Sequence, residues 1–103
     1  MLIDFKKVIL DLKGDPVKLP DKAELTLLSV CQESLMASFP DEQALPGAEK
    51  VKRFVLALKI GDSTLPVEIT IEEAAEIKKL VAKAYGPLVV GRAWEILEKA
   101  EAK

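Results

Sequence analysis

The chain has 103 residues, half of them hydrophobic, and a formal net charge of −2 at pH 7. This length fits one domain with its own core, because domains most often contain about 100–150 residues. The weakly acidic balance removes the electrostatic reason to expect duplex DNA or an anionic membrane surface as the main partner, since such binding depends on Lys and Arg neutralising phosphates. We therefore expect a single domain over 1–103 with no nucleic-acid partner.

Cysteine usage and hydropathy indicate the compartment. Cys31 is the only cysteine, so no disulfide can form within the chain, which fits a reducing environment. The N-terminus lacks the continuous apolar stretch of a secretion signal, and no run approaches the roughly 18 apolar residues of a membrane span. We expect a cytoplasmic protein that does not enter a membrane.

The first twenty residues are predicted to form a β-hairpin. Partial alternation of apolar and polar residues over 8–12 is followed by the turn formers of 13–16 and by a short return strand at 17–19. Two strands alone are marginally stable in water, so this hairpin must pack on helices, join a third strand or pair with another chain. A short strand near 66–69 is a candidate for the third strand.

The first two of four predicted helices follow the hairpin. An apolar stripe that contains Cys31 predicts a helix near 22–38, and a second helix is predicted over 48–60, with Gly61 as its stop. In the second helix, the apolar residues share one face and the basic residues mostly lie off that face, where a solvated role is expected. The apolar face contains Val51, Phe54, Val55 and Leu58, and the basic residues are Lys50, Lys52, Arg53 and Lys59.

The third helix, 71–85, carries the clearest start signal in the chain. Thr70 and Glu73 have the spacing of a capping box, in which each side chain accepts a hydrogen bond from the other residue's backbone N–H. Gly86 is expected to take a left-handed conformation after the helix, and Pro87 suits the first turn of the next one.

The fourth helix is therefore predicted near 87–101. Gly91 in its interior suggests a close backbone approach, because glycine costs a helix roughly 1 kcal/mol relative to alanine. Trp94 is expected to be substantially buried against Leu80, Val81 or Phe54. The predicted fold class is α+β, with an N-terminal β-hairpin, and optionally a third strand, packed on four helices.

Residues for catalysis are almost absent. The chain has no histidine and no glycine motif for phosphate, and the position of Cys31 on an apolar stripe favours a buried thiol over a nucleophile. The acidic pairs at 41–42 and 72–73 lie in a loop and in the first turn of a helix, where capping and the helix dipole explain the second pair. We predict no catalytic, cofactor-binding or metal-binding residue, and no enzymatic activity.

Two segments carry a family resemblance. EKVKRFVLALKI at 49–60 and YGPLVVGRAW at 85–94, with the capped TIEE start at 70–73 between them, resemble small proteins encoded in tailed-bacteriophage and prophage genomes. That family has no firm biochemical assignment. The resemblance implies a non-enzymatic role in virion assembly, head or tail, or in host interaction, and it transfers no site residues.

Three functional classes follow. The favoured one is a phage or prophage assembly protein that is cytoplasmic in the bacterial host or virion-associated and works through interfaces with itself or other phage structural proteins. The alternative is a phage-encoded inhibitor or adaptor that binds a host protein. A DNA-binding regulator is disfavoured, because the helix after Pro87 has Arg92 as its only basic residue before Lys99.

Self-association is expected because the hairpin and every helix supply apolar residues, more than a domain of about 100 residues buries. A free edge or face of the hairpin is best covered by a second chain, and closed homo-oligomers are the commonest solution. The interface is predicted within residues 5–19, with the candidates Val8, Leu10, Leu12, Val17 and Leu19.

Overall fold

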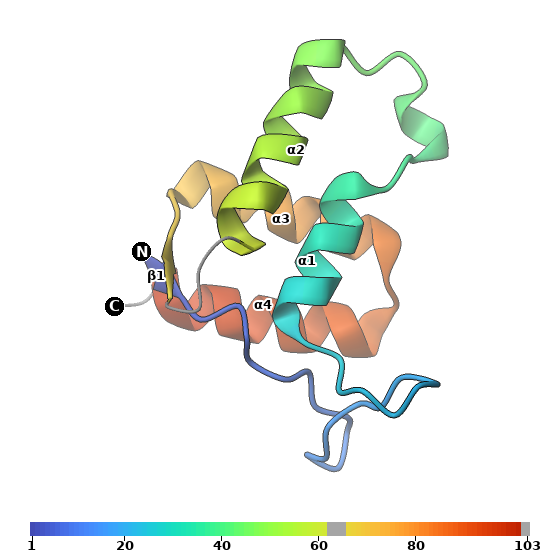
Figure 1. The fold of residues 1–103 in the computed structure, drawn as a ribbon, viewed down its shortest axis with the longest axis vertical. Coiled ribbons are helices and arrows are strands. Elements are labelled where there is room, and N and C mark those ends of the chain that lie inside the picture. Colours follow the sequence, from blue (N-terminus) through green and yellow to red (C-terminus); the bar gives the residue numbers. More distant parts are fainter. Residues whose placement is uncertain (62–65, 102–103) are drawn as a thin grey trace.

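The computed structural model describes residues 1–61 and 66–101 and contains four helices and one antiparallel pair of short strands. The predicted α+β class and the four helices are confirmed (Figure 1). In chain order the elements are β1 (Leu2–Ile3), α1 (Leu27–Met36), the 3-10 turn η1 (Pro40–Glu42), α2 (Gly47–Gly61), β2 (Val67–Glu68), α3 (Ile71–Ala84) and α4 (Pro87–Glu101).

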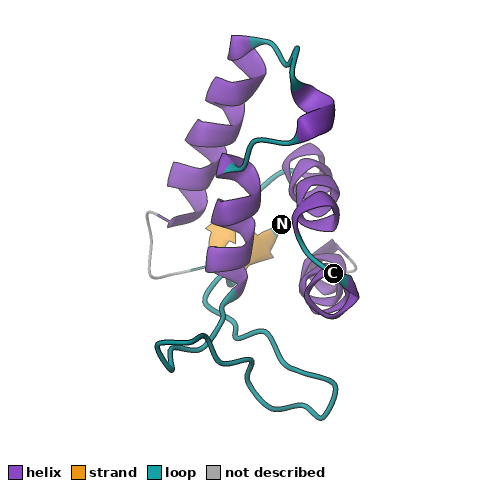
Figure 2. Cartoon of the chain, turned by 90° about the vertical axis from the view of Figure 1, so that its right-hand side faces the viewer, coloured by secondary structure: helices purple, strands orange, loops and turns teal. Residues whose placement is uncertain are grey.

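The helices form two layers, with α1 and α2 in one and α3 and α4 in the other (Figure 2). Helix α1 is central, because it contacts α2, α3 and α4. Helix α2 lies at one end of the 40 Å long axis, and the loops between β1 and α1 lie at the other end (Figure 1).

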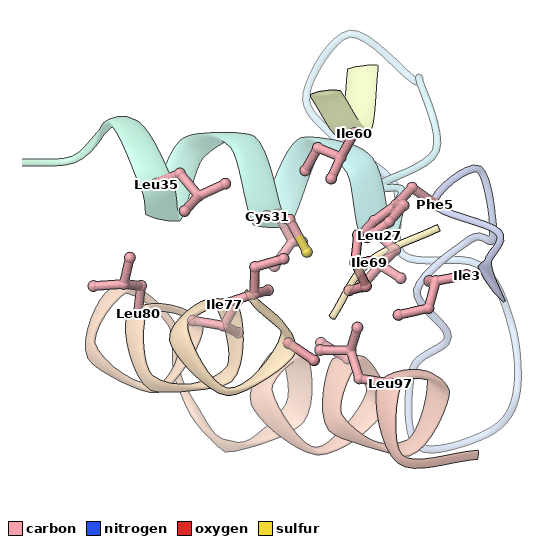
Figure 3. Packing of buried hydrophobic residues seen from close by; sticks show 14 of the residues in the cluster. Ile3, Phe5, Leu27, Cys31, Leu35, Ile60, Ile69, Ile77, Leu80 and Leu97 are labelled. Atoms are coloured by element: carbon pink, nitrogen blue, oxygen red, sulfur yellow. The ribbon is translucent and has the colours of Figure 1, made fainter. Parts of the chain in front are cut away.

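The core lies between the two layers and is closed by the strand pair (Figure 3). Helix α1 contributes Leu27 and Cys31, both fully buried, and they pack toward the inward faces of α3 and α4. Each fully buried aliphatic side chain contributes roughly 1.5–3 kcal/mol relative to leaving it in water. The largest fully buried apolar side chains are Ile3, Ile9, Leu27, Ile60, Ile69, Ile77, Leu80 and Leu97.

The ladder of the sheet pairs β1 with β2, with Leu2 opposite Glu68 and Ile3 opposite Val67. The predicted strand near 66–69 is therefore present, and the extreme N-terminus is its partner. The N-terminal ammonium donates to the Glu68 carboxylate at 2.7 Å, which fixes the first residue at this edge. The antiparallel strand pair therefore joins the N-terminus to residues 67–68, which are far away in the sequence. It does not form within residues 5–19.

Residues 5–26, the N-terminal segment, form three strand-like passes joined by single bridges. The predicted turn is present: Gly14 has φ +90°, and the Asp11 carboxylate accepts from the backbone N–H groups of Lys13 and Asp15. The passes meet in a closed cycle in which Ile9 N–H donates to Leu25, Leu25 to Val17, and Val17 to Ile9. These three bonds, of 2.7, 2.9 and 2.9 Å, satisfy backbone groups that a regular two-stranded hairpin would pair in a ladder.

The cycle also explains why α1 begins at Leu27, later than predicted. Leu25 is committed to Val17 and Ile9, so Thr26 becomes the N-cap and its hydroxyl accepts from Ser29 N–H. Helix α3 starts as predicted, with both hydrogen bonds of the Thr70–Glu73 capping box present.

Two glycine predictions are wrong. Gly86 does not take a positive φ; helix α3 ends through Tyr85, which is extended and donates its N–H to Val81. Gly91 is exposed, and a Cβ placed on it would meet no atom within 4 Å, so no close backbone approach requires it.

Candidate functional site

Helix α2 presents four large apolar side chains to solvent along one face, which we name the α2 ridge. Val51 is 59% exposed, Phe54 48%, Val55 54% and Leu58 56%. Scattered exposed apolar residues are ordinary on a protein surface, but a contiguous apolar patch usually marks an interaction site. The ridge covers two turns of a helix at one end of the molecule (Figure 1).

The opposite face of α2 packs on the body of the protein. Leu56, Ala57 and Ile60 are buried there, and Arg53 is only 6% exposed. The predicted apolar stripe of Val51, Phe54, Val55 and Leu58 is therefore the exposed face of α2, and the assignment of Arg53 to a solvated face is wrong. The helix carries apolar residues on both faces, and tertiary packing selects the face with Ile60.

Arg53 is buried because the turn before α2 supplies its counter-ion. Its guanidinium donates two hydrogen bonds of 2.7 Å to the two oxygens of Glu42 and one of 3.3 Å to Glu76 of α3. Such a bidentate pair satisfies the planar guanidinium, so the charge is compensated away from water. This arrangement fixes the rotation of α2 about its axis and turns the ridge outward.

The charges around Arg53 extend the network to α3. Lys83 Nζ lies 2.9 Å from Asp41 and 3.3 Å from Glu42. The hydrogen bonds from Arg53 lower the pKa of Glu42 to about 2, with Lys83 acting in the same direction against partial burial. Glu42 in turn raises the pKa of Arg53. The pair is therefore ionised throughout the physiological range, and it holds η1 beside α2.

A hollow lies along each side of the ridge. The first, about 450 Å³, runs between α2 and α3 and is lined by Val51, Val55 and Leu56 together with charged residues of both helices. The second, about 320 Å³, lies between α2, the end of α1 and the loop after it, and is lined by Met36, Phe39 and Phe54 among others. The first hollow shares Val51 and Val55 with the ridge and the second shares Phe54, so the ridge and the two hollows adjoin one another.

The five interface candidates predicted from the sequence do not share one exposed face. Leu12 is 89% exposed, whereas Val8, Leu10, Val17 and Leu19 are half-buried. Val17 and Leu19 pack against the hydrophobic core. Most of the apolar surface of this segment is therefore used inside the chain, and its role as an interface stays a prediction.

Arg92 of α4 holds this segment in place. Its guanidinium donates to the carbonyl oxygens of Leu10 and Asp11 at 3.2 and 2.8 Å. Hydrogen bonds from a charged donor contribute roughly 1.5–3 kcal/mol, more than neutral ones. These two hydrogen bonds hold the beginning of the turn at 11–15 against α4.

Trp94 is partly buried on α3. Its indole N–H donates to the carbonyl oxygen of Lys78 at 3.2 Å, and the Lys78 ammonium lies 5.1 Å from the centre of its ring. Phe54, one of its predicted neighbours, belongs to the exposed ridge on α2. Trp94 therefore fastens α4 to α3 and does not reach the ridge.

Cys31 and Tyr85 both have raised pKa values. Burial raises the pKa of the Cys31 thiol to about 12, so the nucleophilic thiolate is suppressed. The Tyr85 hydroxyl donates to Glu33, and partial burial together with this carboxylate raises its pKa. Residues 1–61 and 66–101 contain no group of three or more His, Cys, Asp or Glu placed to hold a metal ion.

Within the same described ranges, no helix is both long and apolar enough to cross a membrane. Comparisons of the chain with protein-family models, with curated proteins and with solved structures found no match. The α2 ridge is the candidate contact surface, and sequence reasoning placed its four residues on one face without recognising that this face is exposed. One signal could have found it: Leu56, Ala57 and Ile60 offer α2 a second apolar face, and only one of the two can be buried.

Proposed function

We propose that this chain is a non-enzymatic protein that works through protein–protein contacts in virion assembly, with the α2 ridge as its contact surface. The observation that carries the proposal is the exposure of Val51, Phe54, Val55 and Leu58 side by side on a regular helix. Because the opposite face of α2 is already packed, the ridge is available to a partner without unfolding any part of the chain.

The assignment to virion assembly is supported by the resemblance of segments 49–60 and 85–94 to small phage and prophage proteins. The first of these segments contains the whole ridge. In this proposal the chain acts in the bacterial cytoplasm or in the particle, and its partners are copies of itself or other structural proteins of the phage.

The test is a matched pair of substitutions in a phage or prophage genome that carries the gene. Leu58→Lys places a charge on the ridge and keeps a good helix former, whereas Leu12→Lys makes the same change on the exposed N-terminal turn. We expect Leu58→Lys to reduce the yield of complete particles at least about tenfold, because a charge buried in an apolar contact is strongly disfavoured. Leu12→Lys should leave the yield unchanged.

An unchanged particle yield in the Leu58→Lys variant would contradict the assembly role. The folded state of both variants is checked by circular dichroism and thermal unfolding of the purified proteins. Since both side chains are exposed, neither substitution should change the unfolding temperature by more than a few degrees.

A further inference from the structure

The four residues of the α2 ridge have a spacing that reads the same in both directions. Val51 and Phe54 are three residues apart, Phe54 and Val55 are adjacent, and Val55 and Leu58 are again three apart. A helix face with this spacing can pack on an antiparallel copy of itself with every ridge residue facing another. Such a self-complementary patch is what a two-fold symmetric dimer requires.

We propose that the ridge binds a second copy of this chain, with the two α2 helices antiparallel and the two-fold axis passing between Phe54 and Val55. This inference rests on the proposed role of the ridge as a contact surface and names its partner. In this register Val51 faces Leu58 of the second copy, while the two copies of Phe54 meet on one side of the ridge and the two copies of Val55 meet on the other side. The Val51–Leu58 contacts then join a smaller side chain to a larger one, which favours interdigitation over collision.

The charges beside the ridge fit the same partner. The hollow between α2 and α3 is lined by three basic and four acidic side chains, so it is almost balanced. Within the chain, Lys59 pairs with Glu73 at 2.9 Å and Lys52 with Glu49 at 3.3 Å. A mixed rim does not attract a strongly charged partner such as a nucleic acid or an acidic tail, but a second copy brings the same mixture of signs.

The size of the surface sets the expected strength. Helix α2 has 15 residues and is therefore about 22 Å long. With a neighbouring helix roughly 8–10 Å away, the ridge and its two hollows form a band about 20 Å wide, a footprint of roughly 400–450 Å². Stable interfaces bury about 800 Å² of accessible surface per partner, so we expect a weak and reversible dimer.

Cysteine cross-linking tests the register. Under mild oxidation of the full chain, a mixture of Val51→Cys and Leu58→Cys proteins should form a linked dimer. Val51→Cys alone should not, because the two copies of position 51 lie about 10 Å apart along the helix axis, beyond the 4.4–6.8 Å that a disulfide spans between Cα atoms. Wild-type protein is the control for Cys31, whose buried thiol should give no linked dimer.

The mass of the protein in solution tests the partner independently of oxidation. We expect the wild type to shift from monomer to dimer as its concentration rises through tens of micromolar, and Leu58→Lys to weaken the dimer about thirtyfold or more, with Leu12→Lys as the unchanged control. Efficient linking of Val51→Cys with itself would overturn the antiparallel register. A wild-type protein that stays monomeric at several hundred micromolar would overturn the dimer.

The failure of this inference can be told apart from failure of the proposed function. If the wild type is monomeric and Leu58→Lys still lowers particle yield, the ridge contacts another structural protein and the second copy is excluded. If the dimer forms in the predicted register but particle yield does not depend on it, the assembly role fails and the dimer stands.

Discussion

The N-terminal segment and helix α2 lie at opposite ends of the molecule, and both are rich in apolar residues (Figure 1). In the N-terminal segment the apolar side chains turn inward: Phe5, Ile9 and Leu25 are buried. In α2 the ridge side chains turn outward while a second apolar set is buried beneath them. The difference shows that apolar content alone does not identify a contact surface. Hydrogen bonds and ion pairs orient each element, and they thereby decide which of its apolar side chains are buried in the core.

Each region is oriented by a buried or half-buried arginine. Arg92 donates to the backbone of the N-terminal turn and draws that segment onto α4. Arg53 is drawn into the body by Glu42 and Glu76, and this rotates α2 so that its other apolar face is exposed.

The largest effect is expected at the centre of the N-terminal segment. Ile9→Ala removes a fully buried side chain and should lower the free energy of unfolding by about 2–5 kcal/mol. Leu12→Ala, three residues along and exposed, should change it by less than about 0.5 kcal/mol. Urea denaturation of both variants measures the difference, and equal effects would mean that the segment is not folded onto the core.

A matched pair inside α2 separates its two faces. Leu56 is 6% exposed and Leu58 56%, so Leu56→Ala should cost about 2–4 kcal/mol and Leu58→Ala less than about 0.5 kcal/mol. The measurement is urea unfolding at low micromolar concentration, where a weak dimer contributes little. A larger loss for Leu58→Ala would place the ridge in the core and end its candidacy as a contact surface.

Removal of the hydrogen bonds between Arg92 of α4 and the N-terminal segment should have an intermediate effect on the free energy of unfolding. Arg92→Met keeps much of the aliphatic stem and removes the two hydrogen bonds to Leu10 and Asp11, so we expect a loss of about 1–3 kcal/mol. Amide hydrogen exchange should accelerate most in residues 10–17. Acceleration spread evenly over the chain would show that Arg92 does not hold this segment specifically.

The acid dependence of stability tests the orientation of α2. Because the pKa of Glu42 is about 2 in the folded chain against a usual 4.5, its ionised form stabilises the fold fully above about pH 4.5, and this contribution is lost as the pH falls from 4.5 through 2. Glu42→Gln should therefore flatten the decline of the urea midpoint over this window.

The control for that experiment is Glu24→Gln in the N-terminal segment. Glu24 pairs with Lys18 at 3.6 Å on the surface, where ion pairs contribute little, so its replacement should leave the acid slope as it is. If both variants flatten the slope equally, Glu42 has no special role in holding α2.

Local signals predicted much of the fold. The Thr70–Glu73 capping box and Pro87 gave the boundaries of α3 and α4 to within about a residue, because caps and helix breakers act over one turn of the chain. The strand at 67–68 and the turn at Gly14 were also predicted by local residue preferences.

The rest depended on contacts between distant residues. The partner of β2 is the extreme N-terminus, and the start of α1 is set by the hydrogen bonds among Ile9, Val17 and Leu25. The exposure of this face of α2 was missed because the rotation of the helix about its axis depends on the hydrogen bonds of Arg53 with Glu42 and Glu76. Helical spacing alone does not reveal which of two apolar faces is buried.

The most direct test of the account is nuclear magnetic resonance of the methyl and aromatic groups as a function of concentration. Dilution from several hundred to about 10 micromolar should shift the signals of Val51, Phe54, Val55 and Leu58 and leave those of Val8, Leu10, Leu12, Val17 and Leu19 in place. Shifts confined to the N-terminal segment would contradict the claim that the exposed face of α2 is where this protein makes its contacts, and no shifts in either set would contradict self-association through this face.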